Sequence, residues 1–205
     1  MTVTKIEAVA NTKTRYKVFL DEQFAFVLYK GELSRYHVTV GEDISSDIYQ
    51  EIREAVLKRA KLRALHLLND MGRTEMQLRQ KLKQNEYTSD VIEETMKYVK
   101  SFGYVNDREY ARSFILNRKN KKSRKELYML LSQKGLSEEI LEEIFEEVYD
   151  DNSSKDAIKS LMEKKKFNPE TATYQEKQKI FAYLTRKGFS FEDIRQVIQI
   201  DGQNA

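Results

Sequence analysis

Cysteine and tryptophan are absent from this sequence, and proline occurs only once in 205 residues. Without cysteine, a disulfide framework, a cysteine-ligated zinc site and a thiol nucleophile are all excluded. A single proline leaves little to interrupt long helices. No apolar run reaches the ~20 residues of a membrane span, and the N-terminus lacks the basic and apolar regions of a secretory signal. The expected location is the cytoplasm, with no membrane partner.

Side chains suited to catalysis are also scarce. The only histidines are His37 and His66, and His66 lies in a leucine-rich helical stretch where packing or solvent exposure is commoner than a ligand role. The sequence contains no H-E-x-x-H, P-loop or G-x-G-x-x-G pattern. Adjacent acids such as Glu93-Glu94 point in different directions on a helix, which favours a solvated face. We therefore expect a protein that is not an enzyme and that binds no metal or cofactor.

Charge is abundant and segregated along the chain. The sequence is 40% hydrophobic and 34% charged, with a net charge of +3. Seven Lys or Arg and no acid occur from Arg112 to Lys125, whereas eight Asp or Glu and no Lys or Arg occur from Leu136 to Asp151. So much charge at ordinary hydrophobicity indicates an elongated helical body with a large solvated surface.

The first 30 residues alternate between apolar and polar in the manner of β-strands. Runs at 16–20 and 24–29 are separated by Asp21-Glu22, which predicts a hairpin, and residues 3–9 are a candidate third strand. After this segment the apolar period becomes that of a helix.

Local signals mark the ends of the helices. Glycines at 72, 103, 135 and 188 each follow an amphipathic run, as glycines just past a helix C-terminus do. Capping-box spacing, or a close variant, occurs at Thr74 with Gln77, Asn106 with Glu109, and Ser123 with Glu126. Asn168-Pro169 reads as an N-cap followed by proline at the first helical position. The predicted helices are 46–71, 74–85, 89–101, 107–120, 123–134, 137–149, 154–166, 170–187 and 190–199.

These helices repeat in threes. Leu82, Leu131 and Leu184 are each followed at five and ten positions by further apolar residues. Ala64, Ala111 and Ala157 match in the preceding helices. The predicted fold is mainly α: three tandem three-helix repeats, sharing a core, form an elongated, curved body behind an N-terminal β-hairpin or three-stranded element. The predicted parts are 1–44 (β element and linker), 45–102, 103–151 and 152–205 (repeats).

The basic run offers the strongest functional signal. Arg112 and Lys119 should lie off the apolar stripe of their helix and reach solvent, with Arg118 at the edge of that stripe. Such cations around a helix–turn–helix corner suit phosphate contacts. Cations near a helix C-terminus also favour the helix dipole, which explains Arg118 and Lys119 without a partner. That alternative explains Arg124 and Lys125 badly, since they begin a helix, where anions are preferred.

The acidic helix 137–149 has two interpretations. Ile140, Leu141, Ile144, Phe145 and Val148 form an apolar stripe, and the glutamates face outward. The simpler interpretation, which we favour, is a solvated amphipathic helix. The other is a contact for a basic protein surface, or a screen between neighbouring repeats.

Three segments, in order and at repeat spacing, carry a family resemblance. GYVNDREYARSFILNRK, starting at Gly103, resembles the second-repeat signature of the RecX family of recombination regulators. RTEMQLRQKL from Arg73 and LSQKGLSEEILEEIF from Leu131 are similar to that family's first-repeat helix and to its later turn and helix. The N-terminal hairpin resembles an extension of Gram-positive members. The family often has a glycine before the helix that follows the basic run, where this chain has Lys121-Lys122-Ser123.

The resemblance implies a non-enzymatic regulator that binds the filament of RecA on single-stranded DNA. Such proteins limit filament growth, ATP hydrolysis and strand exchange. The partners implied are RecA and single-stranded DNA, and we expect a monomer. The residues expected to bind are Arg73, Arg79, Lys83, Arg112, Arg118, Lys119, Lys121, Lys122, Arg124 and Lys125. By the same carry-over, structural roles fall to Gly103, Tyr104, Asn106, Asp107, Tyr110 and Ala111. Two other hypotheses remain: a helical-repeat protein that acts on DNA without RecA, and a protein-interaction scaffold.

Overall fold

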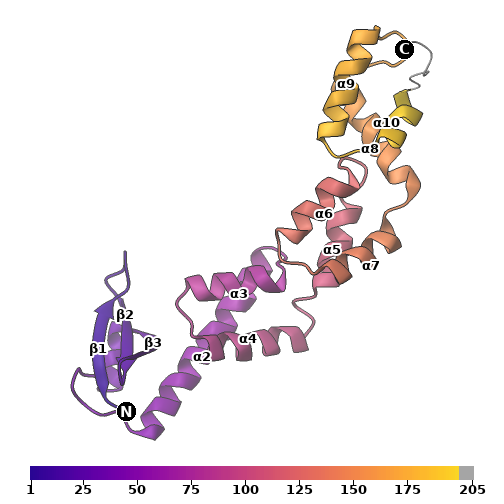
Figure 1. Ribbon diagram of the computed structural model, residues 1–205. Helices are drawn as coiled ribbons and strands as arrows, with labels where there is room; N and C mark the ends of the chain where they lie inside the picture. The colour runs from indigo at the N-terminus through magenta and orange to yellow at the C-terminus, as the bar shows by residue number, and fades with distance from the viewer. Residues whose placement is uncertain (199–205) are drawn as a thin grey trace. The chain divides into compact units, whose positions relative to one another are not determined.

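The computed structural model describes residues 1–198 and divides into two compact units, Met1–Asn106 and a second unit from Asp107 onward (Figure 1). The first unit contains the β element and one three-helix repeat, and the second contains two repeats. The helix predicted over 190–199 is seen as far as residue 198. Its last residue, and residues 199–205 of the predicted third repeat, lie outside the described residues.

The β element is a three-stranded antiparallel sheet in the order β1-β2-β3, formed by Val3–Ala8, Arg15–Leu20 and Gln23–Tyr29. Both the hairpin and the third strand are therefore confirmed. Asp21 and Glu22 form the tight turn with φ of 45° and 66°, the left-handed backbone that a two-residue hairpin needs. A short helix, α1 (Lys30–Arg35), follows β3 directly and was not predicted, because six residues are too few to show a helical period.

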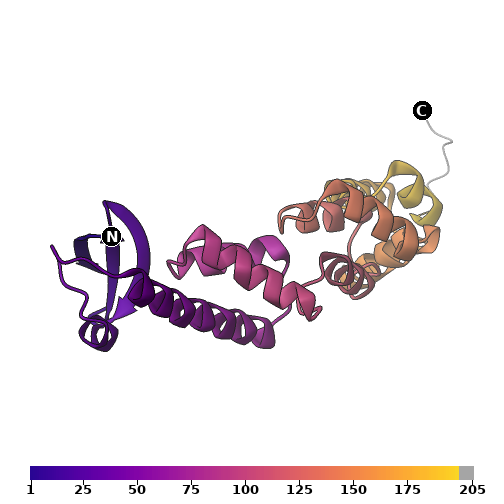
Figure 2. The ribbon, with the colours of Figure 1, turned by 90° about the horizontal axis from the view of Figure 1, so that it is seen from below.

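The first repeat consists of α2 (Ser46–Asp70), α3 (Glu75–Gln84) and α4 (Ser89–Ser101). Figure 2 shows α2 running from the sheet to the α3–α4 pair. The first half of α2 packs Ile52, Val56 and Ala60 against the apolar face of the sheet. Its second half packs Ala64 and Leu67 against α3 and α4. One helix thus joins the β element to the first repeat.

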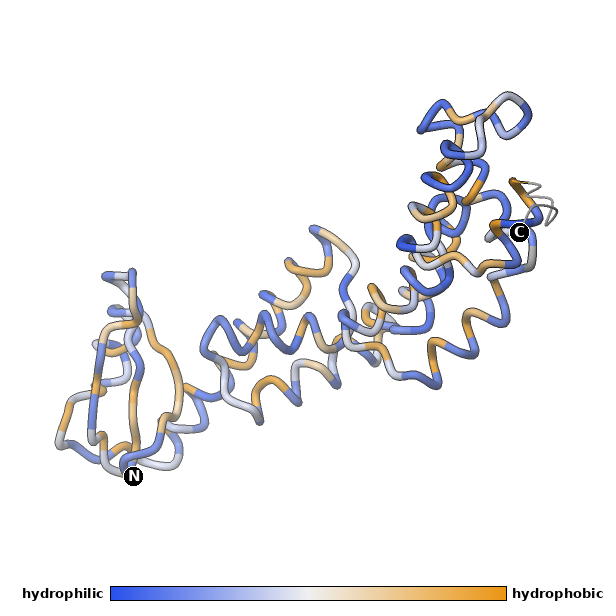
Figure 3. The backbone as a smooth tube through the Cα atoms, turned by 45° about the horizontal axis from the view of Figure 1, so that its top comes forward, coloured by the Kyte–Doolittle hydropathy of each residue, from blue (hydrophilic) through white to orange (hydrophobic). Residues whose placement is uncertain are grey.

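The second unit contains α5 (Asp107–Leu116), α6 (Arg124–Ser132) and α7 (Glu138–Val148), then α8 (Asp151–Lys164), α9 (Tyr174–Arg186) and α10 (Phe191–Ile198). Apolar residues recur among polar ones along the helices, as the helical period predicts (Figure 3). The predicted repeat is confirmed in the interior, because Leu82, Leu131 and Leu184 are all fully buried. The three alanines in the first helix of each repeat are also buried completely.

The expectation of a shared core is wrong. The buried residues form a separate cluster in each repeat, centred on Leu82, Leu131 and Leu184 respectively. Each set of three helices has enough large apolar residues of its own to close a core. The elongated, curved shape stays a prediction.

Several helix ends differ from the predictions. Gly72 is not a left-handed C-terminal glycine: the chain leaves α2 through Met71 in an extended conformation, and the Arg73 side chain satisfies the Leu67 carbonyl instead. Asn168-Pro169 does not start α9. The Asn168 side chain accepts the N–H of Glu170 in a local turn, and the helix begins at Tyr174.

The reason for the later start is a competing cap. Thr173 forms a complete capping box with Glu176, which satisfies two backbone N–H groups at once. The helix predicted over 154–166 begins earlier, at Asp151, because Asp150 accepts the N–H of Ser153. The helix predicted over 107–120 ends at Leu116, and tight turns continue the chain to Ser123.

Candidate nucleic-acid interface

The basic turn, defined here as residues 118–125, leads from the end of α5 into the first turn of α6 and is built from ordinary backbone conformations. The N–H of Lys119 donates to the Ile115 carbonyl at 2.7 Å, and the N–H of Lys122 donates to the Arg118 carbonyl at 3.1 Å. Ser123 then caps α6 by accepting the N–H of Glu126 at 3.1 Å. No residue of the basic turn has a positive φ. This geometry therefore forms without the glycine that the family often has there.

Arg112 was expected to reach solvent and instead lies against its own repeat. Its guanidinium pairs with Glu109 on α5 and with both carboxylate oxygens of Glu147 on α7, where Nε donates at 2.8 Å. The bond from Arg112 holds the pKa of Glu147 below its ordinary value and raises that of Arg112 itself. Both charges are thus largely neutralised within the repeat.

Lys119 was also expected to reach solvent and is likewise engaged. Its ammonium donates to the Val148 carbonyl at 2.9 Å and pairs with Asp150 at 3.4 Å, so it caps the C-terminus of α7. Lys122 pairs with Glu126 one turn along the chain. The sequence could not reveal the partners of Arg112 and Lys119, which lie about 30 residues away.

Arg118 lies at the edge of the apolar stripe, as predicted. Its guanidinium stands over the Phe114 ring at 4.1 Å, and the Lys134 ammonium stands 5.7 Å from the same ring. Tyr110 stacks on Phe114 with centroids 6.1 Å apart. Tyr110 is half-buried against the core of the repeat, as expected.

Four of the predicted cations are exposed and have no carboxylate partner among the described residues. We call these the exposed basic set: Lys83, Lys121, Arg124 and Lys125. Lys83 lies on α3 in the first unit, and the other three lie in the basic turn. Arg124 stands 5.3 Å from the Phe145 ring centroid. These side chains are the ones best able to meet phosphate groups in solution.

The position of Arg124 and Lys125 in a helix first turn has a structural cause that the sequence did not show. The Ser123 hydroxyl donates at 2.6 Å to the carbonyl of Lys187, at the C-terminus of α9. The first turn of α6 therefore faces the negative end of another helix, which favours cations there. The sequence argument that these two charges need an external partner is weakened accordingly.

The other predicted cations of the first unit are occupied. The Nε of Arg73 donates to the Leu67 carbonyl at 3.0 Å. Arg79 pairs with Glu75 and Glu93, and the bond to Glu93 is the main reason that the pKa of Arg79 is raised. Arg73 and Arg79 thus have structural contacts, and Lys83 is the exposed member of this group.

The residues assigned structural roles through the resemblance lie between α4 and α5 and within α5. Gly103 has φ +70°, and its N–H and that of Tyr104 donate to carbonyls of the last turn of α4, a Schellman motif. Ala111 is fully buried. Asp107 begins α5, and Asn106 precedes it at the position of the predicted cap. Tyr104 is 54% exposed, and its ring stacks on that of Phe102.

Sequence reasoning missed a cleft in the third repeat. Tyr174, Phe181 and Phe191 line a cavity of about 480 Å³, with Lys177 and Arg195 among its other lining residues. Tyr174 and Phe191 are about two-thirds exposed. The available signal was an aromatic residue off the apolar stripe of its helix, which packing in that repeat does not require.

Neither a metal site nor a membrane span is present among the described residues. Among residues 1–198, no three His, Asp or Glu side chains come close enough to hold a metal ion. Within the same range, no helix is both long enough and apolar enough to cross a membrane.

Comparisons with known proteins agree on one family along the chain. Family models described as the first, second and third three-helix domains of RecX match residues 60–98, 106–144 and 154–198. The chain is 30% identical to a protein named Regulatory protein RecX from Listeria welshimeri over 195 residues, 94% of this chain and 72% of that one. It is 29% identical to the protein of the same name from Clostridium beijerinckii, over 96% of this chain and 94% of the relative.

Two solved structures have a similar fold. A crystal structure of regulatory protein RecX matches with a TM-score of 0.59 and 24% identity, covering 97% of this chain and 98% of that one. A crystal structure of RecX from Lactobacillus salivarius matches with a TM-score of 0.57 and 25% identity, covering 70% of this chain and 94% of that one.

Proposed function

The chain belongs to the RecX family, and on that basis we propose that it is a non-enzymatic regulator that binds the RecA filament on single-stranded DNA. It restrains filament growth, ATP hydrolysis and strand exchange. The observation that carries the proposal is the ordered match of all three three-helix domains along one chain. RecA and single-stranded DNA are its partners, it acts in the cytoplasm, and it acts as a monomer.

The surface chemistry supports a contact with DNA phosphates. Lys121, Arg124 and Lys125 are exposed in one turn, and Arg118 beside them has no carboxylate partner among the described residues. Cations without internal partners can form charge-assisted bonds to phosphate without first breaking an ion pair. Arg112, Lys119 and Lys122 would have to exchange a carboxylate for a phosphate, so we assign them a secondary part in binding.

The first test is DNA-dependent ATP hydrolysis by the cognate RecA, titrated with this protein at fixed salt. The proposal predicts that hydrolysis is suppressed at well below one copy of this protein per RecA monomer. The reason is that one bound copy limits the growth of a filament of many RecA subunits. Unchanged hydrolysis, together with no binding to the filament, would contradict the proposal. Binding to DNA alone, with no effect of RecA, would instead support a helical-repeat protein that acts without RecA.

A variant test locates the surface. Lys121→Gln, Arg124→Gln and Lys125→Gln together remove three exposed charges that have no ion-pair partner among the described residues, so the fold should persist while filament binding weakens. The matched control is Lys58→Gln with Lys159→Gln and Lys164→Gln, three exposed lysines on α2 and α8 that have no ion-pair partner among the described residues. Equal binding by the triple variant and the control would exclude the basic turn.

Salt dependence measures the number of phosphates contacted. If about three to five phosphates are met, log affinity for single-stranded DNA falls with log salt at a slope of about −2 to −3.5. The triple variant should reduce the magnitude of that slope. An affinity that does not change with salt would exclude phosphate contacts and favour a protein-interaction scaffold.

A further inference from the structure

A second basic site lies in the first unit, between the sheet, α2 and the turn from α3 to α4. It is a cavity of about 420 Å³, lined by Arg15, Arg59, Arg63, Tyr29, Tyr87 and Leu62 among others. A cavity of this size is within the range of pockets that hold small organic ligands. None of the residues predicted to bind from the sequence lines it. Its members come from positions 15 to 87, which is why no local pattern indicated it.

The charge of this arginine pocket is one-sided. Three guanidinium groups line it, and none of its lining residues is Asp or Glu. Arg59 pairs with Glu32 and donates to the Val27 carbonyl at 3.1 Å. Arg15 and Arg63 have only neutral partners among the described residues, since both donate to Asn85, to its backbone and side-chain oxygens at 2.9 Å each.

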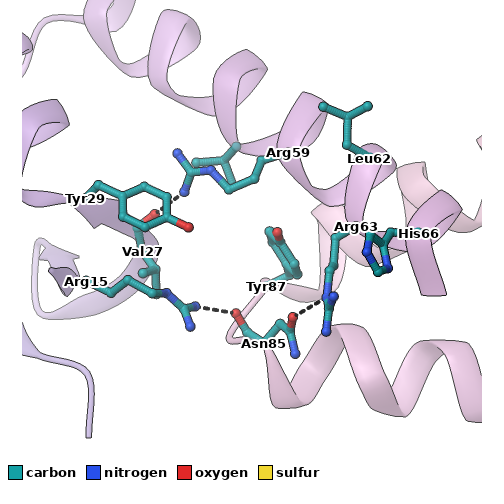
Figure 4. A pocket seen from close by; sticks show the side chains of 10 residues that line it. Arg15, Val27, Tyr29, Arg59, Leu62, Arg63, His66, Asn85 and Tyr87 are labelled. Carbon is teal, nitrogen blue, oxygen red and sulfur yellow. Dashed lines mark hydrogen bonds between the residues drawn. The ribbon is translucent and has the colours of Figure 1, made fainter. Parts of the chain in front are cut away.

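Figure 4 shows Arg15 and Arg63 reaching Asn85 from opposite sides of the pocket. Each uses one nitrogen in that bond, so most of the donors of both guanidinium groups remain available. Both side chains are half-buried, which makes an uncompensated charge more costly than at the open surface. An anion placed beside Asn85 would offset that cost for both arginines. The planar forks of arginine match the oxygens of a phosphate group.

Aromatic and apolar groups complete the pocket. Tyr29 is 43% exposed, and Arg59 lies 4.7 Å from its ring centroid. Tyr87 is half-buried, and burial raises its pKa although three arginines act in the opposite direction. Leu62 lines the same cavity and is 59% exposed. A ligand that is only anionic, such as a carboxylate chain, has no use for these rings, whereas a nucleobase stacks on them.

We propose that the arginine pocket binds one nucleotide unit of a nucleic-acid strand, with the phosphate between Arg15 and Arg63 and the base against Tyr29 and Tyr87. The chemistry of the pocket identifies a nucleotide. That the strand is single-stranded DNA rests on the proposed function. The site is separate from the basic turn, because all of its residues belong to the first unit.

The test uses the full chain without RecA. A ¹⁵N-labelled sample is titrated with the dinucleotide dTpdT, and the expected result is a set of amide shifts centred on residues 15, 63 and 85–87. Inorganic phosphate should bind at the same amides at least about tenfold more weakly, because it lacks a base. Three outcomes would overturn the proposal: no shifts at these amides, equal affinity for a hexaglutamate peptide, or much tighter binding of free dTMP than of the dinucleotide.

Variants separate binding from folding. Arg15→Gln with Arg63→Gln should weaken dTpdT binding at least about tenfold. The same change also removes both hydrogen bonds to Asn85, including the one that joins β2 to the turn between α3 and α4. Leu62→Glu avoids that problem, because it places a negative charge on an exposed lining residue whose side chain forms no hydrogen bond. It should weaken binding about tenfold without lowering Tm. Leu116→Glu, the same change at a 49% exposed leucine on α5, is the matched control and should bind dTpdT normally.

The experiments distinguish a failure of the arginine-pocket proposal from a failure of the proposed function. The triple variant Lys121→Gln, Arg124→Gln and Lys125→Gln should leave dTpdT binding at the arginine pocket unchanged. Conversely, loss of dTpdT binding in Leu62→Glu with normal suppression of ATP hydrolysis would keep both proposals and show that the pocket is not needed for regulation. Normal dTpdT binding by Leu62→Glu would overturn the pocket alone.

Discussion

The second and third repeats have the same order of helices and bury equivalent residues, yet their surfaces are organised differently. In the second repeat, Arg108 and Arg112 of α5 pair with Glu143 and Glu147 of α7. In the third repeat, no ion pair joins two helices among the described residues. Its lysines and arginines are largely exposed, together with the rings of Tyr174 and Phe191.

This difference shows that a run of cations in the sequence is not by itself a binding surface. Within the basic run, Arg112 pairs with Glu147 of α7, Lys119 with Asp150 and Lys122 with Glu126, and only part of the run remains exposed. The interpretation of α7 as a solvated amphipathic helix is supported by the exposure of all six of its glutamates. Two of them, Glu143 and Glu147, also fix α5.

The largest expected effect tests what the two repeats share. Leu131→Ala and Leu184→Ala each remove a fully buried side chain from an equivalent place in the second and third cores. Each should lower the free energy of unfolding by about 2–5 kcal/mol, since the cavity is not refilled. Denaturant unfolding followed by circular dichroism measures both. A much smaller loss for one of them would mean that the two cores are not equivalent.

The next effect concerns the contact between the two repeats. Gly188 has φ +88°, and a Cβ added there would lie 2.9 Å from the Ser123 hydroxyl and 3.2 Å from Lys125 Cβ. Gly188→Ala should therefore cost more than the roughly 1–2 kcal/mol of left-handed strain alone. Gly103→Ala is the control, because it has φ +70° and nothing within 4 Å of the added Cβ. Equal losses in thermal unfolding would show that the Ser123 contact is loose.

A smaller effect, of opposite sign, is expected at Lys166. This exposed residue closes α8 with φ +53°, the conformation that glycine adopts at the ends of other helices. Lys166→Gly should raise the free energy of unfolding by about 0.5–1 kcal/mol, because the strain of a side chain in that region is relieved. Lys159→Gly, inside α8, should instead lower it by about 1 kcal/mol. A loss in both variants would contradict the strain argument.

The smallest expected effect is a pH dependence of stability that comes from the pair between Arg112 and Glu147 in the second repeat. The pKa of Glu147 lies below its ordinary value of 4.5 because Arg112 bonds its carboxylate. The stability from this pair is therefore complete above pH ~4.5 and is lost as the pH falls through the lowered pKa. The Tm difference between the wild type and Glu147→Gln should shrink toward zero on acidification. Glu139→Gln, on the same helix and without an ion-pair partner in the described part of the chain, should show little difference at any pH.

Much of the fold was predictable because its signals are local. Leu82, Leu131 and Leu184 are each followed by apolar residues five and ten positions later. This repeated spacing identifies the three-helix unit. The start of α9 was not predictable, since Asn168 and Thr173 both have N-cap chemistry and the apolar period does not choose between them. The left-handed residues Glu86 and Lys166 were missed for a similar reason, because glycine is the usual signal for that conformation.

The site was less predictable than the fold because its contacts are distant in sequence. Lys121 and Arg112 belong to the same basic run, yet the first is exposed and the second is paired with a residue 35 positions away. The arginine pocket depends on Arg15 meeting Asn85, 70 positions along the chain. No local pattern carries such information, so the sequence located the basic run and the structure identified which of its side chains are exposed.

The separate cores also bear on how the chain acquires its structure during synthesis. Each repeat closes through contacts between residues near one another in sequence, a pattern that favours rapid folding of a segment as it emerges from the ribosome. The second repeat can thus reach its fold before the third has been made. The bond from Ser123 to Lys187 forms only when α9 is complete, so the N-terminus of α6 gains its last partner from the final part of the chain.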